Sequence, residues 1–404
     1  MRKLLLCALL GAANFARAEF STPGFELVQT APLETSLSNS DLRDPATVWC
    51  ELFDGARSQI VLGEFYVVGH ARSSFDQVMA HLTAAGRRGV KIRFLLDQSG
   101  VKISDAATIA QLRAIPNLEL RVINVGGMTG NGILHAKYMV IDGRTAYVGS
   151  QNFDWRSLSH IHETGLRIGD AKIAGQVQAV FDQDWRAQAL MAQGLTVPAL
   201  NQSTVGADYA QDAFLLTSPN AYNPAGVGDS ESGLPALLAA ARSEVRVQLL
   251  DYAPLSYGPN GTRPYYAVID NTLRAAAARG VKIKLMVSNW NVEAPALAYL
   301  KSLAVLPNVE IRVVTLPTMS TGFIPFARVI HSKTMSIDGK VAWVGTSNWS
   351  GGYMDKSRNL EVVMRSEKMA QRVAALHQQT WDSPYAQPLD INKNYPQPAK
   401  AKPE

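Results

Sequence analysis

The sequence predicts an α/β fold built from two pseudo-symmetric α/β-sandwich halves, with the functional site at the interface between the halves. Three observations support this prediction. Stretches of the chain recur, each half alternates strand-like with helix-like segments, and one polar motif occurs once in each half. Of the 404 residues, 47% are hydrophobic and 18% are charged. The chain can therefore bury a substantial core in both halves.

The first 18 residues have the pattern of a secretory signal peptide and are not part of the predicted fold. Arg2 and Lys3 precede an apolar run, and a small-residue cleavage site ends at Ala18. The apolar run is too short to span a bilayer. We therefore expect cleavage after Ala18 and a secreted or periplasmic protein.

Export changes how the cysteines and the net charge are interpreted. Cys50 would be the single cysteine of the mature chain, which leaves no internal disulfide. The formal net charge is +5, but Arg2, Lys3 and Arg17 lie in the predicted signal peptide. The mature chain would be close to neutral, so its overall charge gives little support for nucleic-acid binding.

An internal repeat divides the remaining chain. Residues 88–92 recur at 279–283 and residues 116–122 recur at 307–313, both with an offset of 191. Further downstream the repeated motifs are offset by 196, which places a five-residue insertion before the second motif. A repeat of this length indicates a duplicated fold.

The first half alternates strands and helices. Its first strand is apolar and rich in β-branched residues, which is typical of a buried strand. Ser74 is a plausible cap for the first helix, Gly89 ends that helix, and Pro116 stops the second helix. The expected elements, in order, are a strand at 60–68, a helix at 74–88, a strand at 90–96, a helix at 105–115 and a strand at 118–125.

The second half repeats this order, which favours layered helices on mixed or parallel sheets. An amphipathic helix closes each half, at 171–185 and at 368–381. The other expected elements are strands at 245–250, 281–287 and 309–314, and helices at 265–279 and 295–306.

These patterns divide the chain into five regions. A stretch rich in Ala, Gly, Ser, Asn and Pro separates the halves, and a tail rich in Pro and Lys is expected to be disordered. The regions are the signal peptide at 1–18, the first half at 19–190, the linker with the beginning of the second half at 191–233, the second half at 234–389, and the tail at 390–404.

The repeated motif carries the chemistry. Two of the seven histidines have a lysine two residues later and an aspartate five residues after that lysine. A hydroxyl-bearing turn, an asparagine and a later carboxylate follow in both halves. The first set is His135, Lys137, Asp142, Ser150, Asn152 and Glu163, and the second set is His331, Lys333, Asp338, Thr346, Asn348 and Glu361.

This residue set suits a phosphodiester. Residues following each histidine are strand-like, so His and Lys two apart project to one face. If the two strands meet on a pseudo-twofold axis, one neutral histidine can attack phosphorus and the other, protonated, can donate to the leaving oxygen. The lysines and asparagines can hold the phosphoryl oxygens, with the two hydroxyl groups assisting.

The chain resembles the phospholipase D superfamily from about Phe25 to Leu389, because it carries the complete duplicated motif. Four further segments are similar to the branch that contains the animal endolysosomal members and their poxvirus envelope relatives. These segments are residues 152–158, 250–255, 345–351 and 381–385.

The resemblance implies a phosphohistidine mechanism that uses no metal and no cofactor. It implies that His135 is the nucleophile and that His331 is the general acid and base. It also implies that Glu163 and Glu361 orient the histidines, and that the motif aspartates are structural. A duplicated chain already supplies both half-sites, so no obligate protein partner is expected.

The substrate remains open between three classes. The first is phospholipid, by hydrolysis or headgroup exchange, with a possible peripheral membrane contact. The second is single-stranded DNA or RNA, cut by a nuclease or exonuclease of the same mechanism. The third is a non-catalytic envelope or binding protein.

The segments 126–132 and 316–328 precede the motifs and should rim the site. Phe323, Ile324 and Phe326 in the second segment suit a packed loop, an acyl contact or a base-stacking platform.

Overall fold

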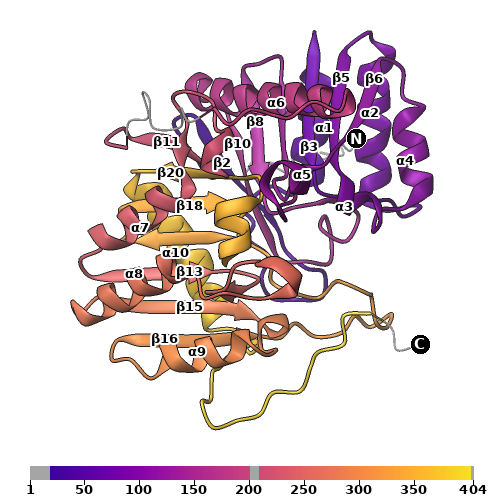
Figure 1. Cartoon of the computed structure of the whole chain (residues 1–404). Helices are drawn as coiled ribbons and strands as arrows, with labels where there is room; N and C mark the ends of the chain where they lie inside the picture. The colour runs from indigo at the N-terminus through magenta and orange to yellow at the C-terminus, as the bar shows by residue number, and fades with distance from the viewer. Residues whose placement is uncertain (1–18, 201–208, 402–404) are drawn as a thin grey trace, which may run out of the picture.

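The computed structural model describes residues 19–200 and 209–401, so the predicted signal peptide lies outside the described residues. The chain forms two α/β halves, drawn from indigo to magenta and from orange to yellow in Figure 1. The predicted fold class is therefore confirmed. No helix in the described ranges is both long enough and apolar enough to cross a membrane.

The first half contains an eight-stranded mixed sheet. Its β3, β5 and β6 strands pair in parallel, whereas β7, β8, β10 and β2 pair antiparallel. In spatial order the strands are β1 (Ser21–Thr22), β2 (Phe25–Thr30), β10 (Glu163–Ile168), β8 (Thr145–Gly149), β7 (Tyr138–Ile141), β3 (Gln59–Glu64), β5 (Lys91–Asp97) and β6 (Leu118–Ile123).

The second half repeats this sheet and adds one strand, β21, at the edge beyond β16. The strands β13, β15 and β16 are the parallel counterparts of β3, β5 and β6. In spatial order the strands are β12 (Gly228–Asp229), β11 (Ala213–Ser218), β20 (Asn359–Met364), β18 (Val341–Gly345), β17 (Thr334–Ile337), β13 (Glu244–Gln248), β15 (Lys282–Ser288), β16 (Val309–Val314) and β21 (Ala386–Pro388).

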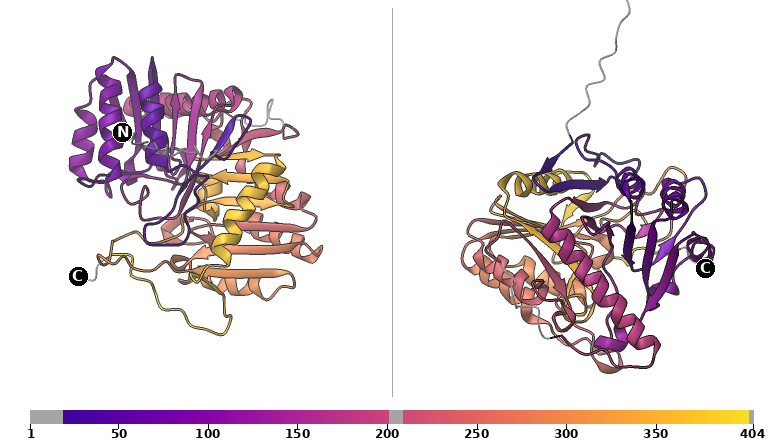
Figure 2. Two further views of the ribbon diagram at one scale, coloured as in Figure 1. Left: turned by 180° about the vertical axis from the view of Figure 1, so that it is seen from behind. Right: turned by 90° about the horizontal axis from the view of Figure 1, so that it is seen from above.

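Helices cover both faces of each sheet. Figure 1 shows α7, α8 and α9 on one face of the second sheet, and the back view in Figure 2 shows α10 on the other face. The helices of the first half are α1 (Pro45–Gly55), α2 (Ser74–Arg87), α3 (Gln98–Val101), α4 (Ala106–Arg113), α5 (Val125–Thr129) and α6 (Ala171–Ala192). Those of the second half are α7 (Ser230–Ala240), α8 (Ala267–Ala278), α9 (Ala296–Ala304) and α10 (Glu367–Trp381).

One hydrophobic core cluster runs through both halves. It joins the first sheet and α6 to the second sheet and α10, through buried side chains such as Leu166, Val177 and Val362. The outer helices of each half pack over separate clusters. Close packing of this kind leaves the two halves little freedom to move relative to each other. The shared core therefore fixes the distance between the two motifs.

The predicted strand at 60–68 is broken, and this changes the site. β3 ends at Glu64, and Val67–Val68 forms a separate short strand, β4, that pairs with β9 (Phe153–Asp154). Phe65 and Tyr66 leave the sheet between them. Ser74 is the first residue of α2 and not its cap, because Ser73 occupies the cap position.

Two regions are more structured than their composition indicates. β11 lies within the predicted linker and pairs along its whole length with β20. Residues 390–401 of the predicted tail lie against the second half, where the carbonyl oxygen of Lys393 accepts a 2.8 Å hydrogen bond from Lys301 Nζ. The segment 126–132, which was expected to rim the site, includes most of the short helix α5, and none of its residues lines the active-site cavity.

Candidate active site

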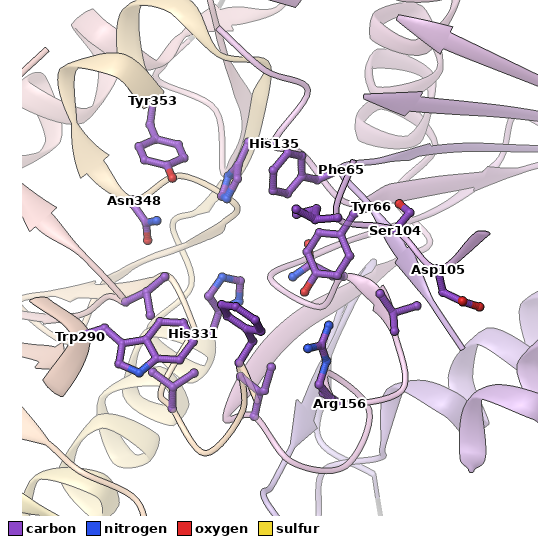
Figure 3. Close-up of a pocket in the computed structure, with 17 residues that line it drawn as sticks. Phe65, Tyr66, Ser104, Asp105, His135, Arg156, Trp290, His331, Asn348 and Tyr353 are labelled. Atoms are coloured by element: carbon purple, nitrogen blue, oxygen red, sulfur yellow. The ribbon is translucent and has the colours of Figure 1, made fainter. Parts of the chain in front are cut away.

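The two motif histidines face the same cavity, as the sequence predicted. His135 and His331 lie immediately before β7 and β17, and both line a cavity of about 470 Å³ between the halves. Figure 3 shows the two imidazole rings on opposite sides of this space. Both residues are largely buried, with exposed fractions of 5% and 8%.

Each histidine is held by the opposite half of the chain. The N–H groups of His135 and of the next residue donate to the carbonyl oxygen of Arg358, at 3.0 and 2.9 Å. The N–H groups of His331 and of the next residue donate to the carbonyl oxygen of His162, at 2.8 and 3.0 Å. Positions 162 and 358 are related by the 196-residue offset, so this support is exchanged symmetrically between the halves.

The side chains behind the two rings break this symmetry. His331 Nδ1 lies 2.8 Å from Glu163 Oε2, whereas His135 Nδ1 lies 2.9 Å from Asn359 Oδ1. The 196-residue offset makes Asn359 the counterpart of Glu163. One ring therefore faces a carboxylate and the other faces a neutral amide.

The expected role of Glu361 is wrong on this evidence. Its carboxylate accepts hydrogen bonds from the hydroxyl groups of Ser230 and Ser347, and Asn359 takes the place next to His135. Glu361 is the third residue of β20, two residues after Asn359, and it pairs with Gly345 of the neighbouring strand β18. A side chain there lies too far along the strand to reach the ring.

Hydrogen bonds fix the orientation of the Asn359 amide and hence the tautomer of His135. Its Nδ2 donates to the carbonyl oxygen of Tyr353 at 2.9 Å, and its Oδ1 accepts from the Thr346 hydroxyl at 2.9 Å. Because a carbonyl only accepts, the amide oxygen must face His135. The His135 Nδ1 then carries the proton, and Nε2 keeps its lone pair for the cavity.

The motif lysines are fully buried beside the histidines. Lys333 Nζ donates to the carbonyl oxygen of His331 at 2.5 Å, and Lys137 Nζ donates to that of His135. Burial lowers the pKa of Lys137 to about 7, although the carboxylates of Glu64 and Glu163 oppose this effect. Burial also lowers the pKa of Lys333 well below its usual value. An anion entering the cavity would restore the charge of both ammonium groups.

Burial also shifts the pKa values of the histidines and of Glu163. It lowers the pKa of both rings well below 6.5, and the two motif lysines add to that effect. Burial raises the pKa of Glu163 to about 7. Because Glu163 and His331 are hydrogen-bonded, they titrate as one unit that can hold a proton near neutral pH. His135 has no carboxylate of this kind at its Nδ1.

The asparagines line the cavity, but the motif hydroxyl groups do not. Asn152 and Asn348 are buried, and their Oδ1 atoms have no hydrogen-bond partner among the described residues. Ser150 Oγ exchanges hydrogen bonds with the backbone of Thr164, at 3.2 and 3.0 Å. Thr346 bonds Asn359, so the hydroxyl groups support the site from behind and do not reach into it.

The motif aspartates stabilise turns away from the cavity. Asp142 accepts from three consecutive backbone N–H groups, at residues 57–59, over 2.8 to 2.9 Å. Asp338 accepts from those at residues 242–244 over the same distances. Both aspartates have positive φ angles, of 53° and 54°. They hold the strand β7 or β17 to the start of its neighbour, in a structural role.

Aromatic side chains that the motif analysis missed line much of the cavity. Phe65 and Tyr66 come from the break between β3 and β4, and Trp290 and Tyr353 come from the second half. The Tyr353 ring meets the His135 ring edge-on, with centroids 4.6 Å apart. The apolar run at 60–68 carried no signal that two of its rings would turn out of the sheet.

The mouth of the cavity is apolar. Ile103 and Phe326 line it and have exposed fractions of 55% and 48%, and Phe323 from the same loop as Phe326 is also exposed. Arg156 lies at the same side and is paired with Asp154 at 2.7 Å. Within the described ranges no group of three or more His, Cys, Asp or Glu is placed to hold a metal ion.

Two α/β halves that each bring a histidine and an asparagine to one cavity, with a lysine buried beside each histidine, define the class of two-histidine phosphodiesterases. A family model described as "Cardiolipin synthase, PLD-like domain" matches residues 49–185 and 263–381, which include both motifs. The chain belongs to the phospholipase D superfamily.

The chain matches most of the length of its relatives, and these relatives carry two kinds of name. Phospholipase D Z of Dictyostelium discoideum is 30% identical, over 90% of each chain. The 5′-3′ exonuclease PLD3 of Rattus norvegicus is 26% identical, over 91% of this chain and 80% of the relative. Phosphatidylserine synthase of Haemophilus influenzae has the same fold, with a TM-score of 0.57 at 12% identity over 85% of each chain.

Proposed function

We propose that this protein is an exported phosphodiesterase that works through a covalent phosphohistidine on His135, without a metal. One observation carries the proposal. Two imidazole rings share one cavity, and one has a carboxylate behind it while the other has an amide. A carboxylate stabilises an imidazolium, and a neutral acceptor leaves a free base. The two rings are therefore equipped for opposite tasks.

The two steps follow from this difference. His135 Nε2 attacks phosphorus, and the bond from phosphorus to the leaving oxygen breaks as His331 donates its Nε2 proton to that oxygen. Neutral His331 then takes a proton from water, which attacks the phosphohistidine and releases His135. The ammonium groups of Lys137 and Lys333 and the amides of the two asparagines stabilise the five-coordinate transition state.

A phospholipid is the substrate class we favour. Ile103 and Phe326 line the mouth with exposed side chains, and Phe323 in the same loop as Phe326 is also exposed. Contact with the acyl chains of a lipid would remove these apolar side chains from water, which is favourable. The reaction would hydrolyse the headgroup, or exchange it where an alcohol replaces water. Secretion to the periplasm or outside the cell would bring the mouth to a membrane surface.

Single-stranded nucleic acid is the second candidate. The rings of Phe65, Tyr66 and Trp290 can stack with bases, which contributes about 1 to 3 kcal/mol per base. The relative of Rattus norvegicus that is named a 5′-3′ exonuclease adds to this alternative.

A panel of substrates separates the two candidates. Purified protein is incubated with phosphatidylcholine and phosphatidylglycerol vesicles, and separately with labelled single-stranded oligonucleotides, each with and without EDTA. We expect turnover of lipid that EDTA leaves unchanged. Turnover of oligonucleotides alone would favour the nuclease, and activity that depends on added metal would contradict the mechanism.

Trapping the intermediate tests the nucleophile. Quenching in alkaline denaturant during turnover of a phosphorus-labelled substrate should leave label that is stable to base and lost in acid on the wild-type protein and on His331→Ala. The label should be absent from His135→Ala, because that variant lacks the attacking nitrogen. Label retained on His135→Ala and lost from His331→Ala would reverse the two roles.

A further inference from the structure

Glu64, the last residue of β3, is a buried carboxylate that has no part in the proposed mechanism. Its exposed fraction is 1%, and its Oε2 has no hydrogen-bond partner among the described residues. Burying a charge is costly unless a group of opposite charge compensates it, so buried carboxylates are normally paired. The free oxygen therefore directs attention to the cation beside it.

The first sheet places Glu64 next to one of the motif lysines. β3 lies between β7 and β5 (Figure 1), and Gly63 pairs with Tyr138 at the start of β7. The next step of this antiparallel register puts Glu64 opposite Lys137, on the same face of the sheet. Lys137 is as deeply buried as Glu64, with an exposed fraction of 1%.

The equivalent position in the second half is apolar. Gln248 of β13 pairs with Thr334 of β17, so the same step of the register puts Leu249 opposite Lys333. Leu249 is fully buried in the hydrophobic core cluster of that half. A carboxylate costs more to bury than a leucine side chain. Its presence at only one of two equivalent positions indicates a task that is specific to Lys137.

Glu64 acts on Lys137 more strongly than the other carboxylates around it do. Burial lowers the pKa of Lys137 to about 7, and Glu64 opposes this effect ahead of Glu163 and Asp97. Glu163 is engaged by His331 at 2.8 Å, and Asp97 accepts from the backbone N–H groups of residues 99, 100 and 134. Glu64 is therefore the carboxylate that is left to serve the lysine.

Glu64 and Lys137 titrate together. Burial raises the pKa of Glu64 well above 4.5, and Lys137 opposes that effect. Two buried groups that shift each other in this way hold their proton as a unit. The phenol groups of Tyr138 and Tyr147 also face Glu64, but burial raises their pKa values well above 10, so they stay protonated.

We propose that Glu64 is a positioning residue for Lys137, which holds a proton on that lysine in the empty site and so keeps an ammonium group ready for a phosphoryl oxygen. This inference rests on the proposed function, because it gives the two motif lysines different tasks at one phosphodiester. Lys137 attracts the anion, whereas Lys333 faces Leu249 and takes up its proton from solvent as the anion binds.

Binding of sulfate to the full chain tests this role without turnover. Sulfate does not titrate near neutral pH, so the pH dependence of its affinity, measured by isothermal titration, reports protonation of the protein. The wild-type affinity should fall as the pH rises through the pKa of Lys137, which is about 7. Glu64→Gln removes the charge that opposes the effect of burial, so the fall should begin at lower pH.

The size of the change follows from the protonated fraction of Lys137. If the pKa falls by about one unit, this fraction at about pH 7.5 falls from about a quarter to about 3%, so sulfate should bind about eightfold more weakly. At about pH 5 the lysine is protonated in both proteins. Glu64→Gln should then bind sulfate at least as tightly as the wild type, because a negative charge near the anion has been removed.

Three further variants show whether the effect passes through the lysine. Lys137→Met should bind sulfate more weakly, and adding Glu64→Gln to it should not move the pH dependence any further. Glu64→Asp keeps the charge and should keep a profile close to that of the wild type. Glu361→Gln removes another fully buried carboxylate, which bonds two hydroxyl groups, and should also keep the wild-type profile.

Three outcomes would overturn the proposal. They are a wild-type pH profile in Glu64→Gln, an equal loss of sulfate affinity at every pH, and a shift that persists when Lys137 is methionine. If Glu64→Gln does not fold, a profile of Glu64→Asp that matches Lys137→Met would also overturn it. A protein that shows the expected sulfate profile but cleaves no phosphodiester would contradict the proposed function and still support the role of Glu64.

Discussion

Replacing Glu163 by glutamine should separate the two chemical steps. The glutamine keeps the size and a hydrogen bond to His331 Nδ1 but removes the negative charge behind the ring. The Glu163 oxygen lies 2.8 Å from that nitrogen, and the carboxyl group is fully buried. The imidazolium of His331 would then lie uncompensated among buried ammonium groups, and its pKa would fall further.

The size of this effect follows from the geometry. A contact of 2.8 Å between nitrogen and oxygen places the charge centres about 4 Å apart, which at an effective dielectric constant of about 20 corresponds to about 4 kcal/mol. That energy equals about three pKa units, so protonated His331 becomes about a thousandfold rarer at neutral pH. General acid catalysis contributes a factor of about 10² to 10⁴, and most of it should be lost.

The loss of general acid catalysis should slow only those substrates whose leaving group needs a proton. An alkoxide must be protonated as it leaves, whereas 4-nitrophenolate leaves without a proton. We expect single-turnover cleavage of an alkyl phosphodiester to slow by about 10² to 10³ in Glu163→Gln. Cleavage of bis(4-nitrophenyl) phosphate should slow less than about tenfold.

Glu361→Gln is the matched control for removing a buried carboxylate. Glu361 bonds Ser230 and Ser347 and no histidine, so this variant should keep the wild-type ratio between the two substrates. Equal losses on both substrates in Glu163→Gln would refute the reasoning, because the carboxylate would then act on something other than the proton of His331.

Three further predictions concern positioning and stability. Asn359→Asp places a carboxylate at His135 Nδ1, so the pKa of that ring should rise by about 1 to 3 units and the ascending limb of kcat/KM should move to higher pH. Arg358→Met leaves the buried carboxylate of Asp184 unpaired, so urea unfolding should show a loss of about 3 to 5 kcal/mol, which Asp184→Leu in the same chain should largely recover. Burial raises the pKa of Asp142, but hydrogen bonds from the 57–59 turn outweigh it and the net pKa is lowered. Its stabilisation is therefore fully present only well above the ordinary pKa of 3.8 and is lost as the pH falls through the lowered value. Asp142→Asn should accordingly be less stable than the wild type at pH 7 and equal to it in strong acid.

The duplication made the fold and most of the site predictable. Residues that are related by the repeat offset occupy equivalent positions in the two halves. The strands after His135 and His331, and the cavity between them, can therefore be predicted from the sequence. The same offset pointed to Asn359, since 196 residues separate it from Glu163. Glu361 is offset from Glu163 by 198 residues, so its chemical type favours it as the counterpart of Glu163 but its register does not.

Other features depend on tertiary contacts that leave no local pattern. Phe65 and Tyr66 belong to an apolar run that reads as one strand, and periodicity alone does not show where a strand leaves its sheet. β11 lies in a stretch of small and polar residues and is a strand because β20 pairs with it. The tail is rich in Pro and Lys, and only the second half supplies the carboxylate that binds Lys400.

Each half supplies the backbone and side-chain groups that hold the histidine of the other half, and these groups differ, so the two sides of the site are not equivalent. Two copies of the first half about a true twofold axis would place a Glu163 behind both rings, and two copies of the second would place an Asn359 behind both. Either assembly would bind a phosphodiester equally well in both orientations. The fused chain has one of each, so in the proposed mechanism only one of the two ester oxygens of a bound phosphodiester would face the protonated ring. Which bond is cut is therefore decided by how the ligand enters, before any chemistry begins.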